Sequence, residues 1–192
     1  MNSKTICGTV TMIIFMIFIG AGTQINAAEY GNGHDYGPLL KELPKTRLSL
    51  ADGLRQKTGA TEIPISAKFE LKGGRLKLSV YTAEKGLAVA AEHNVLMEYL
   101  GSPESSVWRP DVKIFEDYAH IARSAMYLTI LQRSPYTLAD MIQSAREDRP
   151  GAVFSVKPKS VRGKHYFEVL VAHQGTVDEL HYDALTGELV EQ

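Results

Sequence analysis

The chain has 192 residues, a formal net charge of −1 and one cysteine. Near neutrality excludes the broad positive charge with which proteins bind nucleic acid. One cysteine excludes a disulfide scaffold and a thiolate metal site, so stability must come from a packed core.

Residues 1–27 have the order of a secretory signal peptide. Lys4 precedes a largely apolar, uncharged run that ends near Gly22, and the segment TQINAA follows it. We expect cleavage after Ala27 or Ala28, which removes the cysteine and places the mature protein in the periplasm or outside the cell. The alternative is an uncleaved anchor, because the run is nearly long enough to cross a bilayer.

Residues 28–46 are rich in glycine and turn formers, which predicts a flexible N-terminal arm. We expect a solvated tail. The alternative is that four residues of this arm bind a metal or a partner: Tyr30, His34, Asp35 and Tyr36.

Two segments share one pattern for the start of a helix. Each has a hydroxyl residue followed by Leu-Ala-Asp, at Ser49 to Asp52 and again at Thr137 to Asp140. The hydroxyl suits an N-cap, and an acid three residues later suits the positive end of a helix. We therefore predict a helix after each cap.

Strand-like segments follow both helices, over 62–86 and 151–175. They align when Gly74 is set against Gly163, and apolar and polar residues alternate along them. This period of two is typical of a sheet with one buried face.

The sequence thus predicts an α+β fold of two tandem repeats, over 47–101 and 135–192, each a helix packed on an antiparallel meander. The connector, 102–134, should hold a long helix from Asp111 to Arg133. We expect its apolar stripe to pack the repeats together, the alternative being an exposed partner-binding helix. The stripe comprises Ile114, Tyr118, Ala122, Ala125, Met126 and Thr129.

Two other features have alternative interpretations. The first repeat ends without a Thr-Gly turn, and VLMEYLG (95–101) fits a helix at least as well as a last strand. Trp108, the sole tryptophan, either covers the edge of a core or anchors an interface.

The second repeat allows a strand register to be predicted. If Gln174-Gly175 is a two-residue hairpin turn, Val169 faces Leu180 and Glu168 faces His181. The apolar pair then lies on one face, and the acid–histidine pair forms a surface pair on the other.

The closing DALTGE segment has the chemistry of a structural turn. Asp183 can accept bonds from the backbone ahead of it, Thr186 is a turn former, and Gly187 can adopt the left-handed conformation. A turn explains all three residue types without an active site.

Three segments, TLADMIQSA, KHYFEVLVAHQG and ELHYDALTGELVE, resemble the PepSY domain family, which is associated with peptidase propeptides. The resemblance covers 135–192 well and 47–100 more weakly, because the first copy lacks the Asp-Ala-x-Thr-Gly ending. It implies a small helix-on-sheet module outside the cytoplasm that binds or inhibits proteins and has no catalytic residues.

The residues themselves give no catalytic or metal-binding pattern. No two of the six histidines have the spacing of a helical metal site, and neither a Gly-x-Ser-x-Gly elbow nor a phosphate-binding loop is present. We therefore expect no enzymatic activity, no cofactor and no metal.

The sequence thus favours a non-catalytic secreted or periplasmic module that binds a protein such as a peptidase or an envelope sensor, and that inhibits or regulates a peptidase. The expected surface is formed by Tyr166, Glu168, Leu170 and His181, which the register turns away from the helix. The alternative is an extracytoplasmic sensor of a small ligand or metal, bound between the repeats or by the arm.

Overall fold

The computed structural model describes residues 35–190, which lie in one compact unit. The expected leader and arm residues Tyr30 and His34 lie outside the described residues. Four α-helices and two short 3-10 helices are present in this part of the chain: α1 (Gly37–Glu42), η2 (Leu43–Lys45), α2 (Leu50–Lys57), η3 (Ala91–His93), α3 (Tyr118–Arg133) and α4 (Leu138–Asp148). The strands are β1 (Ile63–Lys72), β2 (Arg75–Ala83), β3 (Leu96–Gly101), β4 (Asp111–Ile114), β5 (Ala152–Val161), β6 (Lys164–His173) and β7 (Thr176–Asp183).

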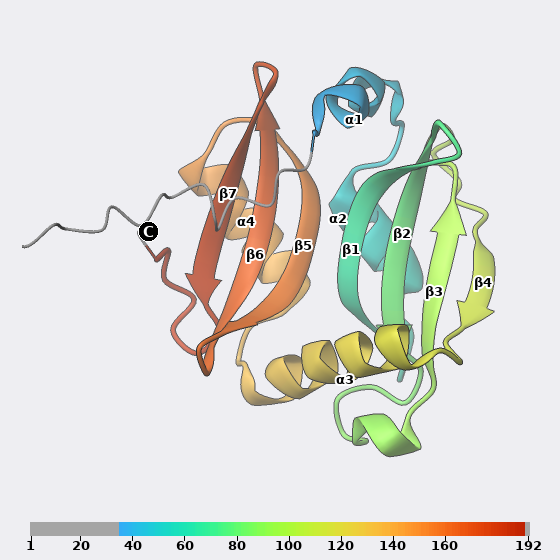
Figure 1. The fold of residues 1–192 in the computed structure, drawn as a ribbon, viewed down its shortest axis with the longest axis vertical. Coiled ribbons are helices and arrows are strands. Elements are labelled where there is room, and N and C mark those ends of the chain that lie inside the picture. The colour runs from blue at the N-terminus through green and yellow to red at the C-terminus, as the bar shows by residue number, and fades with distance from the viewer. Residues whose placement is uncertain (1–34, 191–192) are drawn as a thin grey trace, which may run out of the picture. The chain divides into compact units, whose positions relative to one another are not determined.

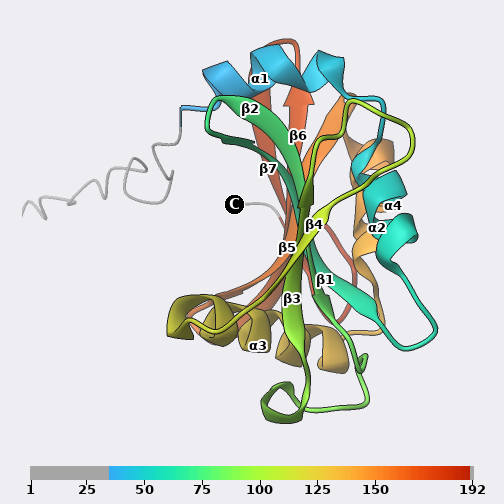
Figure 2. The same cartoon turned by 90° about the vertical axis from the view of Figure 1, so that its right-hand side faces the viewer.

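The strands form one antiparallel sheet in the order β4-β3-β2-β1-β5-β6-β7 (Figure 1). The fold class is therefore α+β, as predicted. Helix α2 contacts β1 and β2, and α4 contacts β5 and β6 on the same face (Figures 1 and 2). Helix α3 crosses the other face, where it contacts β1 and β5.

Both predicted helix starts are confirmed as capping boxes. The Ser49 hydroxyl accepts a bond from the Asp52 backbone N–H at 3.1 Å, and the Asp52 carboxylate accepts one from the Ser49 N–H at 3.0 Å. Thr137 and Asp140 repeat this arrangement at the start of α4. The predicted apolar face of α4 is buried: Leu138, Met141, Ile142 and Ala145.

The register predicted for β6 and β7 is also confirmed. Glu168 pairs with His181 and Val169 with Leu180, around a turn in which Gln174 and Gly175 both have positive φ angles. Two consecutive left-handed residues match the twist of the flanking strands, which fixes the pairing.

Hairpins β1–β2 and β5–β6 have the same register at a constant offset of 89 residues. Ile63 pairs with Ala83 as Ala152 pairs with Ala172, and the same bulge interrupts both ladders, after Pro64 and after Val153. The two hairpins join through a short antiparallel seam, in which Ala67 pairs with Val156 and Lys68 with Ser155. The hairpins thus belong to one continuous sheet.

The structure settles one open alternative and shows that two expectations about local structure were wrong. Residues 96–101 form β3, which pairs with β2, so the helical alternative does not hold. Residues 111–114 form strand β4, and the helix begins after Asp117, whose side chain accepts a bond from the His120 N–H at 3.0 Å. Residues 37–45 of the expected arm are helical, with Leu39 and Leu43 buried.

The apolar stripe proposed for the connector helix was also wrong. Most of its members are exposed, including Tyr118 at 86%. The buried face of α3 lies elsewhere on the helix and comprises Ser124, Tyr127, Leu128, Ile130 and Leu131. Trp108 is buried, in agreement with a role at the edge of the core.

The closing turn has the predicted chemistry. The Asp183 carboxylate accepts bonds from the N–H groups of Leu185 and Thr186 at 2.8 and 3.1 Å, and Gly187 has a φ of 72°. Tyr136 packs against Gly187 and donates its hydroxyl to the Thr186 carbonyl at 2.7 Å. The turn is thereby tied to the segment that leads into α4.

Substitution of Gly187 tests this contact. A Cβ at Gly187 would lie 2.6 Å from the Tyr136 ring, whereas a Cβ at Gly163, which also has a positive φ, would meet nothing within 4 Å. Gly163→Ala should therefore cost about 1 kcal/mol of unfolding free energy through backbone strain alone. Gly187→Ala should cost at least about 1 kcal/mol more through overpacking. Urea denaturation measures both, and equal costs would show that Tyr136 is not held in place.

Candidate functional site

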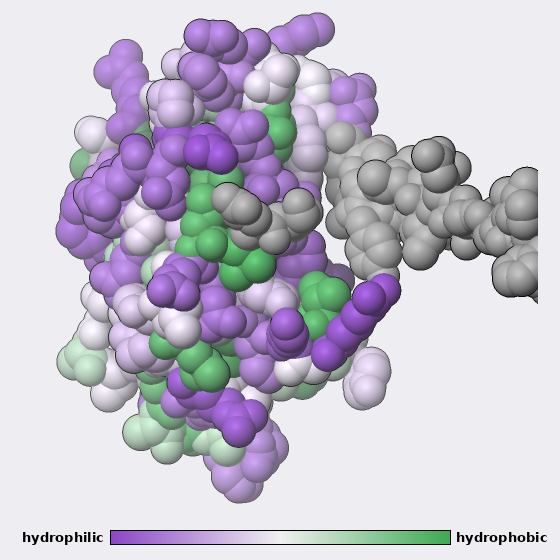
Figure 3. All heavy atoms as spheres, turned by 90° about the vertical axis from the view of Figure 1, so that its left-hand side faces the viewer, coloured by the Kyte–Doolittle hydropathy of each residue, from purple (hydrophilic) through white to green (hydrophobic). Residues whose placement is uncertain are grey.

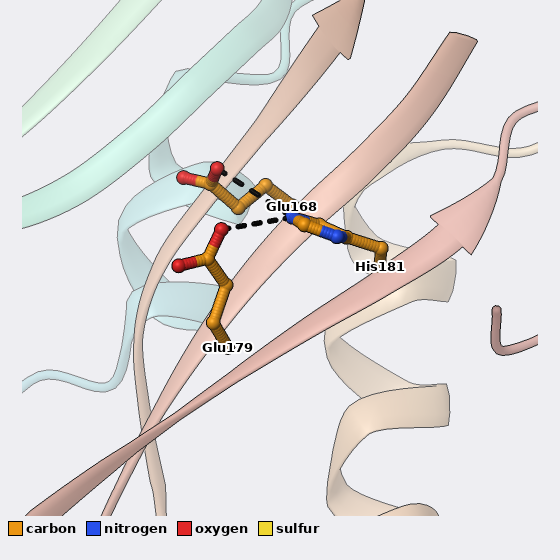
Figure 4. A group of neighbouring side chains, drawn as sticks. All are labelled: Glu168, Glu179 and His181. Atoms are coloured by element: carbon orange, nitrogen blue, oxygen red, sulfur yellow. Dashed lines mark hydrogen bonds and ion pairs between the residues drawn. The ribbon is translucent and has the colours of Figure 1, made fainter. Parts of the chain in front are cut away.

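The polar face of β5, β6 and β7 carries a group of five ionisable residues, which we call the charged cluster: Lys157, Lys159, Glu168, Glu179 and His181. Alternation along each strand brings the five side chains to the face that α3 crosses. Figure 4 shows the His181 ring extending along this face toward both carboxylates.

Glu168 is the buried centre of the cluster, with a side chain only 4% exposed. Lys157 Nζ lies 2.6 Å from Glu168 Oε1, and Lys159 Nζ forms an ion pair with Oε2. His181 Nε2 lies 3.7 Å from the same Oε2. Burial alone would raise the pKa of Glu168, but its interactions with the histidine and the two lysines outweigh burial and hold the pKa well below its usual value. Glu168 is therefore a carboxylate at neutral pH.

Lys159 lies between both carboxylates and the histidine. Its Nζ donates to Glu168 and to Glu179 Oε1, the latter at 3.0 Å, and lies 3.3 Å from His181 Nε2. His181 Nε2 is also 2.9 Å from Glu179 Oε1. Burial acts to lower the pKa of Lys159, but the bonds to Glu168 and Glu179 raise it above the usual value. Lys159 thus remains an ammonium group.

Two tyrosines from other elements lie near the cluster. Tyr36, which precedes α1, packs edge-on against Phe154 at a ring distance of 5.6 Å. Burial raises its pKa, and the charges of Glu168 and Glu179 raise it further. Burial also raises the pKa of Tyr127 on α3, with Glu168 adding to the effect. Both phenols are therefore neutral neighbours of the cluster.

The four residues expected to bind a partner share one face but differ in exposure. Tyr166 and His181 are partly buried, with ring centroids 6.1 Å apart. Glu168 and Leu170 are buried, so the expected exposed surface pair is wrong for Glu168. The reason is that Lys157 and Lys159 on β5 cover its carboxylate, a contact that the β6–β7 register alone does not reveal.

Sequence reasoning missed Lys157, Lys159 and Glu179. The Arg162-Gly163 pair was a signal that could have revealed Lys157. These two residues, which both have positive φ angles, form the turn between β5 and β6, and a two-residue turn at this point sets Lys157 opposite Glu168. Of the arm residues that the structure describes, Asp35 accepts a bond from the Gly37 N–H at 2.9 Å, just before α1. Asp35 is thus accounted for by a local turn.

The cluster has one arrangement suited to a cation. Glu168, Glu179 and His181 each offer one ligand atom, and the three atoms lie within 4.8 Å of one another. Carboxylate oxygen and imidazole nitrogen are common zinc ligands. These residues are the ones that could hold a metal, although Lys159 already lies among them.

An apolar cavity of about 230 Å³ lies on another part of the molecule, where α2 and the start of α4 approach each other. Its polar side chains are already bonded within the protein: Thr58 to the Leu54 carbonyl, Thr137 to Asp140, and Tyr136 to the Thr186 carbonyl. The lining comprises Leu54, Thr58, Ile63, Pro64, Leu87, Leu131, Tyr136, Thr137, Leu138 and Ala139.

Comparisons with known proteins add little to this description. No family model matches the chain, and no curated protein matches it either. A crystal structure of a predicted lipoprotein from Clostridium difficile 630 aligns over 68% of this chain and 81% of its own, with 8% identity and a TM-score of 0.35. A likeness of that size supports no argument about fold or function. Within residues 35–190, no helix is long and apolar enough to cross a membrane.

The ion pairs of Glu168 predict how stability depends on pH. A carboxyl with a lowered pKa in the folded state stabilises the protein above its unfolded pKa, near 4.5, and this stabilisation is lost as pH falls toward the folded value. The unfolding free energy should thus decrease as the pH falls below about 5. Glu168→Gln should reduce this slope and cost about 3 kcal/mol at pH 7, because it leaves a buried ion pair without its anion.

Guanidinium denaturation at a series of pH values measures both effects. The exposed Glu104 serves as the control, and Glu104→Gln should follow the wild-type curve. A Glu168→Gln curve parallel to the wild type would show that Glu168 does not control the acid sensitivity.

Proposed function

We propose that the protein is a non-catalytic, extracytoplasmic protein-binding module that receives an extended segment of its partner along the edge of β7. The observation that carries this proposal is the unpaired part of that edge, Thr176 to Leu180. β7 is the last strand of the sheet, and an exposed edge is a template for an added strand.

The backbone bonds show which groups of β7 point outward. The Val190 N–H donates to the His181 carbonyl at 2.8 Å, and the Asp183 N–H donates to the Glu188 carbonyl at 2.9 Å. By alternation, the backbone groups of Val177 and Glu179 also point outward. Among residues 35–190, no strand pairs with this outer part of β7.

The edge has the character of a binding surface rather than of an aggregation site. Figure 3 views this side of the molecule and shows a mostly hydrophilic surface with smaller apolar areas. Glu179, 38% exposed, is the most accessible member of the charged cluster and lies on the free part of the strand. A partner strand would therefore gain backbone bonds at the edge and meet a charged side chain beside it.

Resemblance to the PepSY family supports a binding role, with a peptidase or an envelope sensor as the partner and inhibition or regulation as the outcome. The constant offset between the two hairpins supports a tandem PepSY-like arrangement. The extracytoplasmic location rests on the signal-peptide pattern of residues 1–27. Because Glu168 and Leu170 are buried, we assign recognition to the exposed edge and treat those two residues as its support.

A second candidate function is the binding of a small apolar ligand by a sensor. The cavity between α2 and α4 favours it, because the lining is largely apolar and its polar side chains are already bonded. A ligand that bound there would raise the melting temperature of the protein, whereas an unused cavity would give no shift.

Proline substitution on β7 tests the proposed edge. The Val177 N–H points away from β6, so Val177→Pro removes no bond of the ladder but blocks an incoming strand. Val112→Pro is the control at the opposite edge of the sheet, on β4. The Phe115 N–H donates to the Leu96 carbonyl and therefore points toward β3. Because these groups alternate along a strand, the Val112 N–H points away from β3. The partner would first be captured from the native envelope or culture supernatant with the tagged protein and identified by mass spectrometry.

Titration of the purified partner should then show affinity reduced roughly tenfold or more by Val177→Pro and unchanged by Val112→Pro. If Val177→Pro leaves both the affinity for the partner and the melting temperature unchanged, the β7 edge is not the binding site. If only Val112→Pro reduces the affinity, the partner binds at β4.

A further inference from the structure

Glu168, Glu179 and His181 place three possible zinc-ligand atoms within 4.8 Å of one another. His181 Nε2 lies 2.9 Å from Glu179 Oε1 and 3.7 Å from Glu168 Oε2. Tetrahedral zinc with ligands near 2.1 Å sets neighbouring ligand atoms about 3.4 Å apart. Small rotations of the side chains would bring the three atoms to that distance, and solvent could supply the fourth ligand.

A cation already lies among these atoms, because it is part of the chain. Lys159 Nζ contacts Glu168 Oε2 and Glu179 Oε1 and lies 3.3 Å from His181 Nε2. The ammonium group therefore faces all three candidate ligands. Lys157 differs, because it binds the other oxygen of Glu168, at 2.6 Å.

The lysine and its three neighbours occur together in only one of the two matching halves of the sheet, on β5, β6 and β7. Across β2 and β3, Ser79 pairs with Leu100 where Glu168 pairs with His181 across β6 and β7. Glu70 stands at the position that corresponds to Lys159, at the offset of 89 residues. The first half thus lacks both the imidazole and the lysine, and its Ser79 instead donates to Glu98 at 2.6 Å.

We propose that Glu168, Glu179 and His181 form a site for a divalent transition metal, with zinc as the best fit, and that Lys159 is its internal occupant. The ammonium group excludes metal ions from the site in the resting protein. A metal ion can enter only if Lys159 swings out and His181 Nε2 offers its lone pair, so lysine and metal binding are mutually exclusive.

Removal of the ammonium group should open the site. Lys159→Met keeps the apolar stem and removes the charge. Calorimetric titration of the full chain with Zn²⁺ should show roughly 100-fold tighter binding for Lys159→Met than for the wild type, because the wild type must break two charge-assisted bonds. Lys157→Met is the control beside the same carboxylate and should bind as the wild type does.

The double variant Lys159→Met with His181→Ala assigns the ligands. The double variant should return zinc affinity to the wild-type level. Zinc binding by other parts of the chain would be the same in the wild type and in all three variants. If Lys159→Met is unfolded without metal, Zn²⁺ should restore its circular dichroism spectrum and should fail to do so for the double variant.

Three results would overturn the proposal. The first is a Lys159→Met protein that binds zinc no more tightly than the wild type. The second is an unfolded Lys159→Met protein that zinc does not refold. The third is a double variant that retains the gain in affinity.

Discussion

The sheet has two faces to cover, and the helices cover them unequally. On one face, α2 and α4 bury the apolar side chains of both hairpins, among them Val80 and Val169, which are fully inaccessible. On the other face, α3 crosses the strands near one end only (Figure 1). Strands β5 to β7 therefore keep charged side chains on a partly covered face, where a buried carboxylate such as Glu168 must be neutralised by neighbouring cations. The position of the charged cluster follows from this unequal covering.

The sequence allowed prediction of features set by neighbours along the chain. Ser49 and Thr137 begin helices because each hydroxyl is followed by an acid three residues later, a pattern contained within one turn. Gln174-Gly175 sets the register of β6 and β7, and that register placed Glu168 opposite His181. The α+β class and two of the five residues of the charged cluster, Glu168 and His181, therefore followed from local rules. The partner-binding role and the PepSY-like arrangement stay predictions.

Features set by distant segments could not be predicted in this way. Asp111 follows a proline and resembles a helix cap, yet it begins β4 because β3 offers an edge to pair with. The apolar stripe predicted for the connector helix is mostly exposed, because the residue types along a helix do not determine which of its faces packs on the sheet. Burial of Glu168 depends on Lys157 and Lys159, which belong to the neighbouring strand β5. The pairing of Glu168 with His181 across β6 and β7 therefore predicts a surface pair when β5 is not considered.

The seam between β1 and β5 has a consequence for how the protein is made. Its partners, Ala67 and Val156, are separated by most of the folded chain, so this pairing carries a high loop-closure cost and a slow folding step. During synthesis from the N-terminus, one side of β1 stays unpaired until β5 has been made. The newly made first half therefore exposes the surface that the second half later covers, and a chaperone or a second nascent chain can meet it in that interval.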